Sequence, residues 1–290
     1  MAKYFLGLCS CLMVVFLGWA QPKRVMDVYL IGGQSNATGQ GIFKNIPPDF
    51  FIDTAVRFFY GNGLQGTGKP MQWGPLCQAS ETNDKFGVEL SMGTKLHEYY
   101  PKRQIGLIKY ALSGSNLYSQ WAPGSHTADT INYGAEFKKF VQTVDAALEQ
   151  LKAKGIRPRL KGMVWIQGEA DARDIAGGTH AEAYGKNLKH FIQRVREQWK
   201  VPDLPFLYAY VIPVPLQRFT GREEVRRGQQ QVDQQSGHPL SVKNAFAIAT
   251  DDLQLRADDK NTPFPDDKVH FGTLGVWELG KRFAQKLKIR

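Results

Sequence analysis

Cysteine is scarce in this sequence. Of its 290 residues only 3 are cysteines, and Cys9 and Cys11 lie in an apolar N-terminal stretch. If that stretch is removed, Cys77 remains alone, so we expect no internal disulfide and no disulfide-stapled scaffold. A lone cysteine of this kind is more often a small buried side chain than a reactive thiol.

Metal-ligand spacing is also missing. The chain has 6 histidines, but no H-x-x-x-H or C-x-x-C pattern, so we expect no metal. The glycine-rich segment Gly63–Lys69 resembles a phosphate-binding loop in sequence. However, Pro70 stands where a Ser or Thr would hold Mg²⁺, and no helical pattern follows. We therefore expect no nucleotide and no cofactor.

Long hydrophobic runs are absent except for Tyr4–Trp19. Lys3 precedes this run and the small residue Ala20 follows it, which is typical of a secretory signal peptide over residues 1–20. The protein is then secreted or periplasmic, with no stable membrane insertion after cleavage. The alternative is an N-terminal anchor, although the run falls short of the roughly 20 residues that span a bilayer. Residues 21–290 are expected to form a single domain.

An excess of acidic residues is absent too, because the formal net charge is +10. The basic residues of the chain are scattered and are not interleaved with aromatic residues, so the sequence shows no nucleic-acid-binding motif. A positive balance favours acidic partners in general, and an anionic polysaccharide is left open.

Apolar segments alternate between strand-like and helix-like patterns. Strands are predicted at residues 25–31, 56–60, 104–111, 161–166, 205–212 and 245–250. Helices are predicted at residues 88–99, 137–151, 181–199 and 274–287, and residues 61–75 are predicted to be a long loop. This alternation predicts an α/β fold with a parallel central sheet and helices on both faces, and a site beyond the carboxyl ends of the strands.

A serine follows the first predicted strand directly, in the segment Gly32-Gly33-Gln34-Ser35-Asn36. Glycines before a serine allow a sharp turn that presents its hydroxyl. Because Ala37 stands where G-x-S-x-G needs a glycine, this is no α/β-hydrolase nucleophile elbow. Taken alone, the segment could equally be a Ser/Asn turn or helix cap.

Three other segments carry complementary chemistry. Asp267 lies three residues before His270, where it could orient the imidazole as a base. Gln167 follows the strand at residues 161–166, and Gly114 follows the strand at residues 104–111; a side-chain amide and a backbone N–H could both donate to an oxyanion. Each segment alone is a plain loop, but together they supply the groups that acyl transfer needs.

The chain resembles the SGNH hydrolases, in particular the carbohydrate esterases of the acetylxylan esterase and sialate O-acetylesterase group. The resemblance rests on GGQSNATG (32–39), KFGVELSMG (85–93), ALSGSNLYSQW (111–121), WIQGEAD (165–171) and DKVHFG (267–272). It departs from the family at Ala37 and Thr38, where a Met usually follows GQSN, and at Ser113, where a Gly is common.

This resemblance implies a flavodoxin-like three-layer α/β/α fold and no metal. It implies that Ser35 is the nucleophile, that His270 is the base, and that the oxyanion hole consists of the N–H groups of Ser35 and Gly114 with the Gln167 side chain. Asp267 is the expected orienting acid, and Glu169 is the alternative. Substrate contacts are expected from Gln34, Asn36 and Trp121.

The sequence thus predicts a serine esterase that removes O-acetyl groups from carbohydrate. Acetylated xylan or its oligosaccharides is the leading substrate, and O-acetylated sialic acid is the alternative. A non-catalytic glycan-binding protein on the same fold is the rival from another class. Trp73, Trp121 and Tyr118 are candidates for stacking on a sugar, although such residues more often belong to a core.

Overall fold

The computed structural model describes Met1 and residues 24–173 and 178–288; the predicted signal peptide at residues 1–20 falls almost wholly outside them. A seven-stranded sheet runs through the molecule in the order β11-β10-β9-β1-β8-β3-β5. Its strands are β1 (Arg24–Gly33), β3 (Arg57–Tyr60), β5 (Gly74–Pro75), β8 (Gln104–Ala111), β9 (Ile156–Ile166), β10 (Phe206–Ala209) and β11 (Ala245–Ile248). All neighbours pair in parallel except β5, which is antiparallel to β3.

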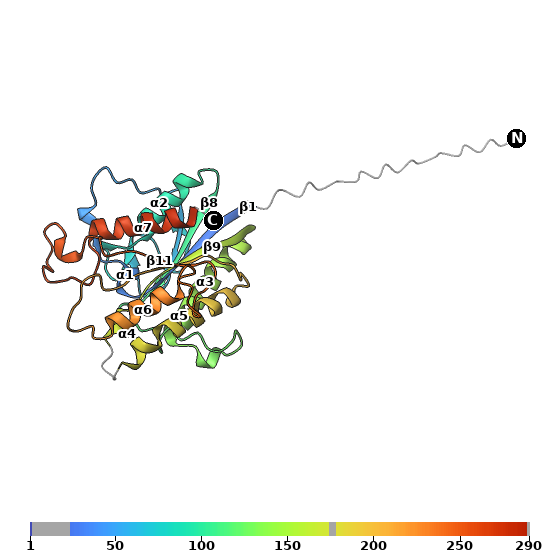
Figure 1. Cartoon of the computed structure of the whole chain (residues 1–290). Helices are drawn as coiled ribbons and strands as arrows, with labels where there is room; N and C mark the ends of the chain where they lie inside the picture. The colour runs from blue at the N-terminus through green and yellow to red at the C-terminus, as the bar shows by residue number, and fades with distance from the viewer. Residues whose placement is uncertain (2–23, 174–177, 289–290) are drawn as a thin grey trace.

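Helices cover both faces of this sheet (Figure 1). On one face lie α2 (Glu89–Tyr99) and α7 (Thr273–Lys288), and on the other lie α3 (Ala135–Ala153), α5 (Thr179–Gln198) and α6 (Arg222–Val232). The short helices are α1 (Ser35–Thr38) and α4 (Glu169–Ala172), and the 3₁₀ turns are η1 (Phe43–Asn45), η2 (Thr130–Asn132) and η3 (Arg256–Asp258). Two small antiparallel pairs complete the fold: β2 (Gly41–Ile42) with β7 (Lys85–Phe86), and β4 (Gln65–Gly66) with β6 (Ala79–Ser80). The predicted α/β fold with a mostly parallel central sheet is confirmed.

The central strand β1 divides the core in two. Met26, Val28 and Leu30 pack into the cluster beneath α3, α5 and α6, whereas Tyr29 and Ile31 pack into the cluster beneath α2 and α7. This alternation follows from the two-residue repeat of a strand. Because both faces are covered, β1 is apolar almost throughout, as parallel strands in such sheets usually are.

The order of the strands places a crevice at the carboxyl end of β1. After β1 the chain builds β3 and β8 on one side, and only later β9, β10 and β11 on the other. The segments that follow β1, β8 and β9 therefore emerge side by side, at the point where ligands bind in sheets of this kind. Those segments contain Ser35, Gly114 and Gln167.

In the described residues, no helix is long and apolar enough to cross a bilayer.

Candidate active site

The turn after β1 presents Ser35. Gly33 has a φ of 138°, and a Cβ there would lie 2.1 Å from the carbonyl oxygen of Ile166 on the neighbouring strand β9. Only glycine fits this position. The Gln34 N–H donates to the same carbonyl at 2.9 Å, and α1 begins with the next residue, Ser35. The hydroxyl thus stands at the carboxyl end of the central strand.

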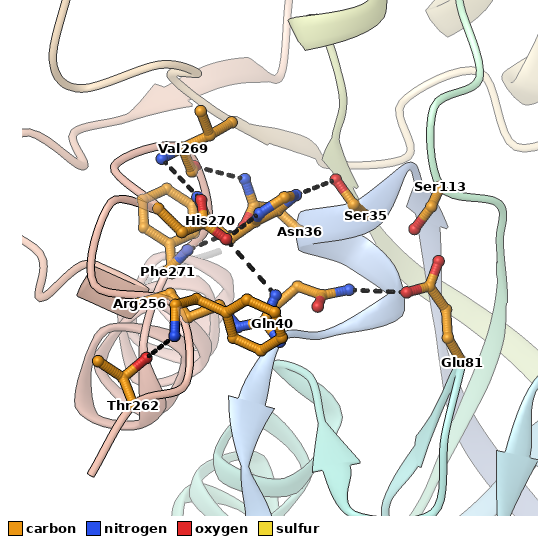
Figure 2. Close-up of polar contacts among 12 residues, drawn as sticks. Ser35, Asn36, Gln40, Glu81, Ser113, Arg256, Thr262, Val269, His270 and Phe271 are labelled. Atoms are coloured by element: carbon orange, nitrogen blue, oxygen red, sulfur yellow. Dashed lines mark hydrogen bonds and ion pairs between the residues drawn. The ribbon is translucent and has the colours of Figure 1, made fainter. Parts of the chain in front are cut away.

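Ser35, His270 and Asp267 form a hydrogen-bonded series. Ser35 Oγ lies 2.9 Å from His270 Nε2 (Figure 2). His270 Nδ1 lies 2.7 Å from Asp267 Oδ2. The second carboxylate oxygen of Asp267 accepts the N–H groups of Val269 and His270, each at 3.2 Å. The local turn therefore fixes the carboxylate and, through it, the imidazole. A hydroxyl, a base and an acid in this order have the geometry that activates a nucleophile in serine hydrolases.

Electrostatics keep Asp267 ionised. Burial raises the pKa of its carboxyl, but the hydrogen bond and charge of His270 and the two N–H donors outweigh burial and lower the pKa to about 2. The Arg256 guanidinium lies 3.4 Å from Asp267 Oδ2 and stacks over the Phe264 ring, 3.5 Å from its centroid. The carboxylate that faces His270 is thus charged near neutral pH.

Glu169, the alternative orienting acid, contacts Asn36 and not the imidazole. Asn36 Nδ2 donates to Glu169 Oε1 at 2.7 Å and to the carbonyl of Val269 at 3.2 Å, and Asn36 Oδ1 accepts the N–H of Phe271 at 3.0 Å. The turn that carries Ser35 is therefore joined to the loop that carries His270. Asn36, from which a substrate contact was expected, is itself 1% exposed and absent from the pocket wall.

Gln167 is also turned away from the pocket. Its Nε2 lies 2.5 Å from Asp171 Oδ2, 3.1 Å from the carbonyl of Ser115 and 3.2 Å from Gln34 Oε1. Because an amide nitrogen carries two hydrogens, these three acceptors already use its donors. The side chain is fully buried and does not line the pocket. In this structure the amide therefore ties three strand ends together, and its expected place in an oxyanion hole stays a prediction.

Asp171 holds the loop that contains Gly114. Its carboxylate accepts the N–H groups of Leu117 at 2.8 Å and Tyr118 at 3.1 Å. Burial raises the pKa of Asp171 to about 6, partly offset by these donors and by Gln167. Gln34 supports the same region, because its Oε1 accepts the N–H of Ala170 at 3.1 Å. Although it is only 3% exposed, Gln34 reaches the pocket wall, where a substrate contact was expected.

Two backbone N–H groups border the pocket beside Ser35 Oγ. Gly114 adopts a φ of 71°, and open space lies where a side chain would project. In the part of the chain that the structure describes, neither the Ser35 N–H nor the Gly114 N–H donates a hydrogen bond to the backbone. Both residues line the pocket, as expected of oxyanion donors.

The pocket has a volume of about 810 Å³, which suits a small molecule or a sugar unit. Glu169, Ala170, Val269 and His270 line it near Ser35. Other charged side chains in its wall are the basic Lys85, Arg173, Arg218 and Arg256 and the acidic Glu81. On the described residues, no group of His, Cys, Asp and Glu side chains gathers in a way that could hold a metal ion.

Trp121, from which a substrate contact was expected, lies in the core and does not line the pocket. It is fully buried, its Nε1 donates to Ser115 Oγ at 2.8 Å, and its ring meets Trp165 edge-on at 4.9 Å. Trp73 also lies away from the pocket, against Phe59. Tyr118 alone among the aromatic candidates lies near it, because its ring stacks on His180, a residue of the pocket wall, at 4.0 Å.

The sequence did not point to a buried ion pair behind the nucleophile turn. Lys109 Nζ on β8 lies 2.7 Å from Glu89 Oε2 on α2 and donates to the carbonyl of Thr38 at 2.8 Å. Both side chains are fully buried. The sequence held one signal for this ion pair, namely a lysine inside the otherwise apolar run Gln104–Ala111. A charge buried in such a run requires a partner of opposite charge.

Residues 25–288 match the family described as "Carbohydrate esterase, sialic acid-specific acetylesterase", and the chain belongs to this family. It is an enzyme that acts as a carbohydrate acetylesterase.

The relatives are distant in sequence. A probable carbohydrate esterase of Arabidopsis thaliana is 22% identical over 281 residues, which cover 91% of each chain. Its crystal structure has a TM-score of 0.64 at 19% identity, over 92% of this chain and 98% of that one. NanS has a TM-score of 0.65 at 15% identity, over 92% and 97%. A carbohydrate acetylesterase from Xanthomonas citri has a TM-score of 0.55 at 19% identity, over 89% of this chain and 54% of that chain. At these identities the structures establish a shared fold.

Proposed function

We propose that Ser35 is the nucleophile of an esterase that removes O-acetyl groups from a sugar, with His270 as its base and Asp267 as the orienting acid. The observation that carries this proposal is the continuous series Ser35 Oγ–His270 Nε2 at 2.9 Å and His270 Nδ1–Asp267 Oδ2 at 2.7 Å, at the wall of a sugar-sized pocket.

The first half-reaction forms an acetyl-enzyme. His270 Nε2 takes the proton of Ser35 as Oγ attacks the carbonyl carbon of the acetyl group. The negative charge that develops on the carbonyl oxygen is stabilised by the N–H groups of Ser35 and Gly114. The carbon–oxygen bond to the sugar then breaks, and His270 returns the proton to the departing sugar oxygen.

The second half-reaction releases acetate. His270 takes a proton from water as the water oxygen attacks the acetyl carbon, and the bond to Ser35 Oγ breaks. His270 then returns the proton to Ser35. Asp267 stays ionised throughout and stabilises the imidazolium formed in each half. Gln167 keeps the loops of Gly114 and Gln34 in place.

The charge of the pocket wall bears on the choice of sugar. Lys85, Arg173 and Arg218 line the pocket, and none forms an ion pair within residues 24–173 and 178–288. Cations without an ion-pair partner among the described residues attract an acidic ligand more strongly than a neutral one. We therefore favour an O-acetylated acidic sugar such as acetylated sialic acid over acetylated xylan, which the sequence alone had placed first.

Acetate release from two substrates tests this proposal. The protein from residue 21 onward is assayed with O-acetylated N-acetylneuraminic acid and with acetylated xylo-oligosaccharides, and we expect the higher kcat/KM for the acidic sugar. Arg218→Gln should raise KM for that sugar about tenfold. Arg227→Gln is the matched control, because Arg227 is exposed on α6 and does not line the pocket.

Two results would count against the proposal. A higher kcat/KM for xylo-oligosaccharides, unaffected by Arg218→Gln, would restore xylan as the substrate. Binding of either sugar without any release of acetate would indicate a glycan-binding protein.

We also propose that residues 1–20 are cleaved and that the enzyme is secreted or periplasmic. The apolar run after Lys3 and the small residue Ala20 support this. Mass spectrometry of the protein from the native host should give Gln21 as the first residue of a soluble exported fraction. An intact N-terminus in the membrane fraction would mean that the segment is kept as an anchor.

A further inference from the structure

The carboxylate oxygen that holds His270 also contacts a buried arginine. Asp267 Oδ2 lies 2.7 Å from His270 Nδ1 and 3.4 Å from Arg256 Nη1. Arg256 is 5% exposed, and its guanidinium lies over the Phe264 ring, 3.5 Å from the centroid. A charge that is shielded from water in this way acts on its neighbours with little screening. The guanidinium is therefore placed to influence both the acid and the imidazole that the acid holds.

The backbone near Arg256 fixes the same loop without help from the arginine side chain. The Arg256 N–H donates to the His270 carbonyl at 2.7 Å, so the two residues lie side by side (Figure 2). The Ala257 N–H donates to the Asp267 carbonyl at 3.0 Å, and Asp267 Oδ1 accepts two N–H groups of its own turn. Because these bonds need no guanidinium, the loop should keep its shape when residue 256 loses its charge. The side chain adds a positive charge beside Asp267 and the contact with Oδ2.

Other charged groups surround this pair on several elements. Glu169 on α4 interacts electrostatically with His270, and Asp84 does so with Arg256. Asp266 and Lys268 are exposed on the loop of His270. The remaining charged or titratable groups of the pocket wall are Glu81, Lys85, Arg173, His180 and Arg218. Within residues 24–173 and 178–288, Asp267 forms ion pairs only with Arg256 and His270. Arg256 is thus the cation that shares the orienting acid with the imidazole.

A cation beside Asp267 opposes the protonation of His270. A carboxylate in contact with an imidazole favours the imidazolium form, whereas a neighbouring positive charge disfavours it. An imidazole that already carries a proton on Nε2 cannot take the proton of Ser35. The guanidinium therefore moves the pH at which the base is lost toward acid.

We propose that Arg256 is a positioning residue: by sharing Asp267 Oδ2 with His270, it keeps the imidazole unprotonated, and so able to act as the base, at lower pH than Asp267 alone would allow. This inference rests on the proposed function, because it takes His270 to be the base. It gives the guanidinium a role that acts through Asp267 and not through the sugar.

The pH profile of kcat/KM tests this inference, with p-nitrophenyl acetate as substrate. This ester has no charge and no titratable group, so a changed attraction for an acidic sugar does not affect the result. Arg256→Met removes the charge, and the acid limb of the profile should move to higher pH by about 0.5 to 1 unit. Well below the limb, this shift is a further loss of roughly three- to tenfold in kcat/KM. Arg256→Lys keeps the charge and should keep the limb near its wild-type position.

Arg194→Met is the matched control for the loss of a buried arginine. Arg194 is 2% exposed and pairs with Glu197 on α5, and it does not line the pocket. Its replacement should lower the melting temperature and leave the acid limb in place. At alkaline pH the loss of kcat/KM in Arg256→Met should stay within about tenfold, because two backbone N–H groups still hold Asp267. If Arg256→Met does not fold, Arg256→Gln removes the charge and keeps a hydrogen-bond donor.

Titration of His270 in an inactive protein separates this inference from the proposed function. NMR follows the imidazole signals of His270 in Ser35→Ala, identified by their loss in Ser35→Ala with His270→Asn. Adding Arg256→Met should raise the midpoint of this titration by about 0.5 to 1 pH unit, whether or not the wild type hydrolyses any ester.

The inference is overturned if the midpoint and the acid limb stay in place or move to lower pH in Arg256→Met. It is equally overturned if Arg256→Lys or Arg194→Met shifts them as far as Arg256→Met does, because the charge beside Asp267 would then not be the cause.

Discussion

The turn that carries Ser35 is held from two sides, and the two sides differ in how completely their bonding is satisfied. On the side of β8 and α2, Lys109 Nζ contacts the carbonyls of Thr38 and Ala79 and the carboxylate of Glu89, at 2.8, 2.6 and 2.7 Å. Glu89 Oε1 also accepts the Gly87 N–H at 2.9 Å. On the side of β9, Asn36 joins Glu169 to the loop of His270, and Glu169 Oε2 has no partner.

This difference separates a cluster behind the pocket from a cluster at its wall. Both contain fully or almost fully buried carboxyls, so burial alone does not tell them apart. Lys109 and Glu89 satisfy one another and do not line the pocket, whereas Glu169 lines it with one oxygen unused. Unused hydrogen-bonding capacity, rather than a buried charge, therefore distinguishes the two clusters.

The largest effect is expected where both sides converge, at the hydroxyl that they position. Ser35→Ala should lower kcat by roughly 10³ to 10⁶, because the nucleophile is lost while the pocket and the oxyanion donors remain. Acetate release under saturating substrate measures this, with the melting temperature as a check on folding. A folded variant that retained more than about a tenth of the activity would remove Ser35 from the mechanism.

The next effect compares the acid that contacts His270 with the acid that does not. Asp267→Asn should lower kcat by about 10⁴ in a protein that still folds, because the imidazole loses the partner of its Nδ1. Glu169→Gln should have a far smaller effect on kcat. If Glu169→Gln were instead stable and inactive while Asp267→Asn behaved almost normally, Glu169 would be the orienting acid.

Lys109→Met should act on stability rather than on chemistry. It leaves Glu89 buried without its cation, and breaking such a pair costs about 3–5 kcal/mol in the free energy of unfolding. Urea denaturation measures this loss, and KM for p-nitrophenyl acetate should hardly change in the folded fraction. Lys109→Met with Glu89→Gln is the control, because removing the orphaned charge should recover part of the stability. A large fall in kcat with normal stability would instead assign the ion pair to catalysis.

The smallest effect concerns the response of stability to acid. The pKa of Asp267 is about 2 in the folded protein and about 3.9 when unfolded, so its stabilising effect is complete above the unfolded value and is lost as pH falls through the folded one. This amounts to roughly 2 kcal/mol. The difference in unfolding free energy between wild type and Asp267→Asn should therefore shrink between about pH 5 and pH 2. A difference that stayed constant over this range would show that the His270 contact does not depend on charge.

The sequence predicted those parts of the fold that have a strong apolar period. The strand at residues 104–111 has the predicted bounds, and β9 extends earlier than predicted because its first residues alternate between exposed and partly buried. Helix α6 was missed because its apolar residues are few, essentially Val225 and Val232. It packs on α5 through Gly228, whose Cα lies 3.0 Å from where a Cβ on Gly185 would be. A contact between two glycines leaves no hydrophobic pattern in the sequence.

The site could be predicted only where a residue's role depends on its place in the chain. Ser35 comes soon after a strand and Asp267 lies three residues before His270, so the local sequence is enough to predict both residues as members of the site. The partners of Asn36 and Gln167 come from residues more than a hundred positions away or from other strand ends, and no local pattern specifies them. Trp121 was misplaced for the same reason, since whether an aromatic side chain faces the core or a cleft depends on how the elements pack.

The position of β1 has a consequence for how the enzyme loses activity. This strand is paired on both sides along most of its length, with Met26–Gly33 against β8 and Arg24–Gly33 against β9. Segments protected in this way open only when the whole domain opens. Ser35 comes soon after that strand, so it is anchored to a segment that is paired on both sides. Heat inactivation should therefore follow global unfolding, and the amide protons of β1 should be among the last to exchange with solvent.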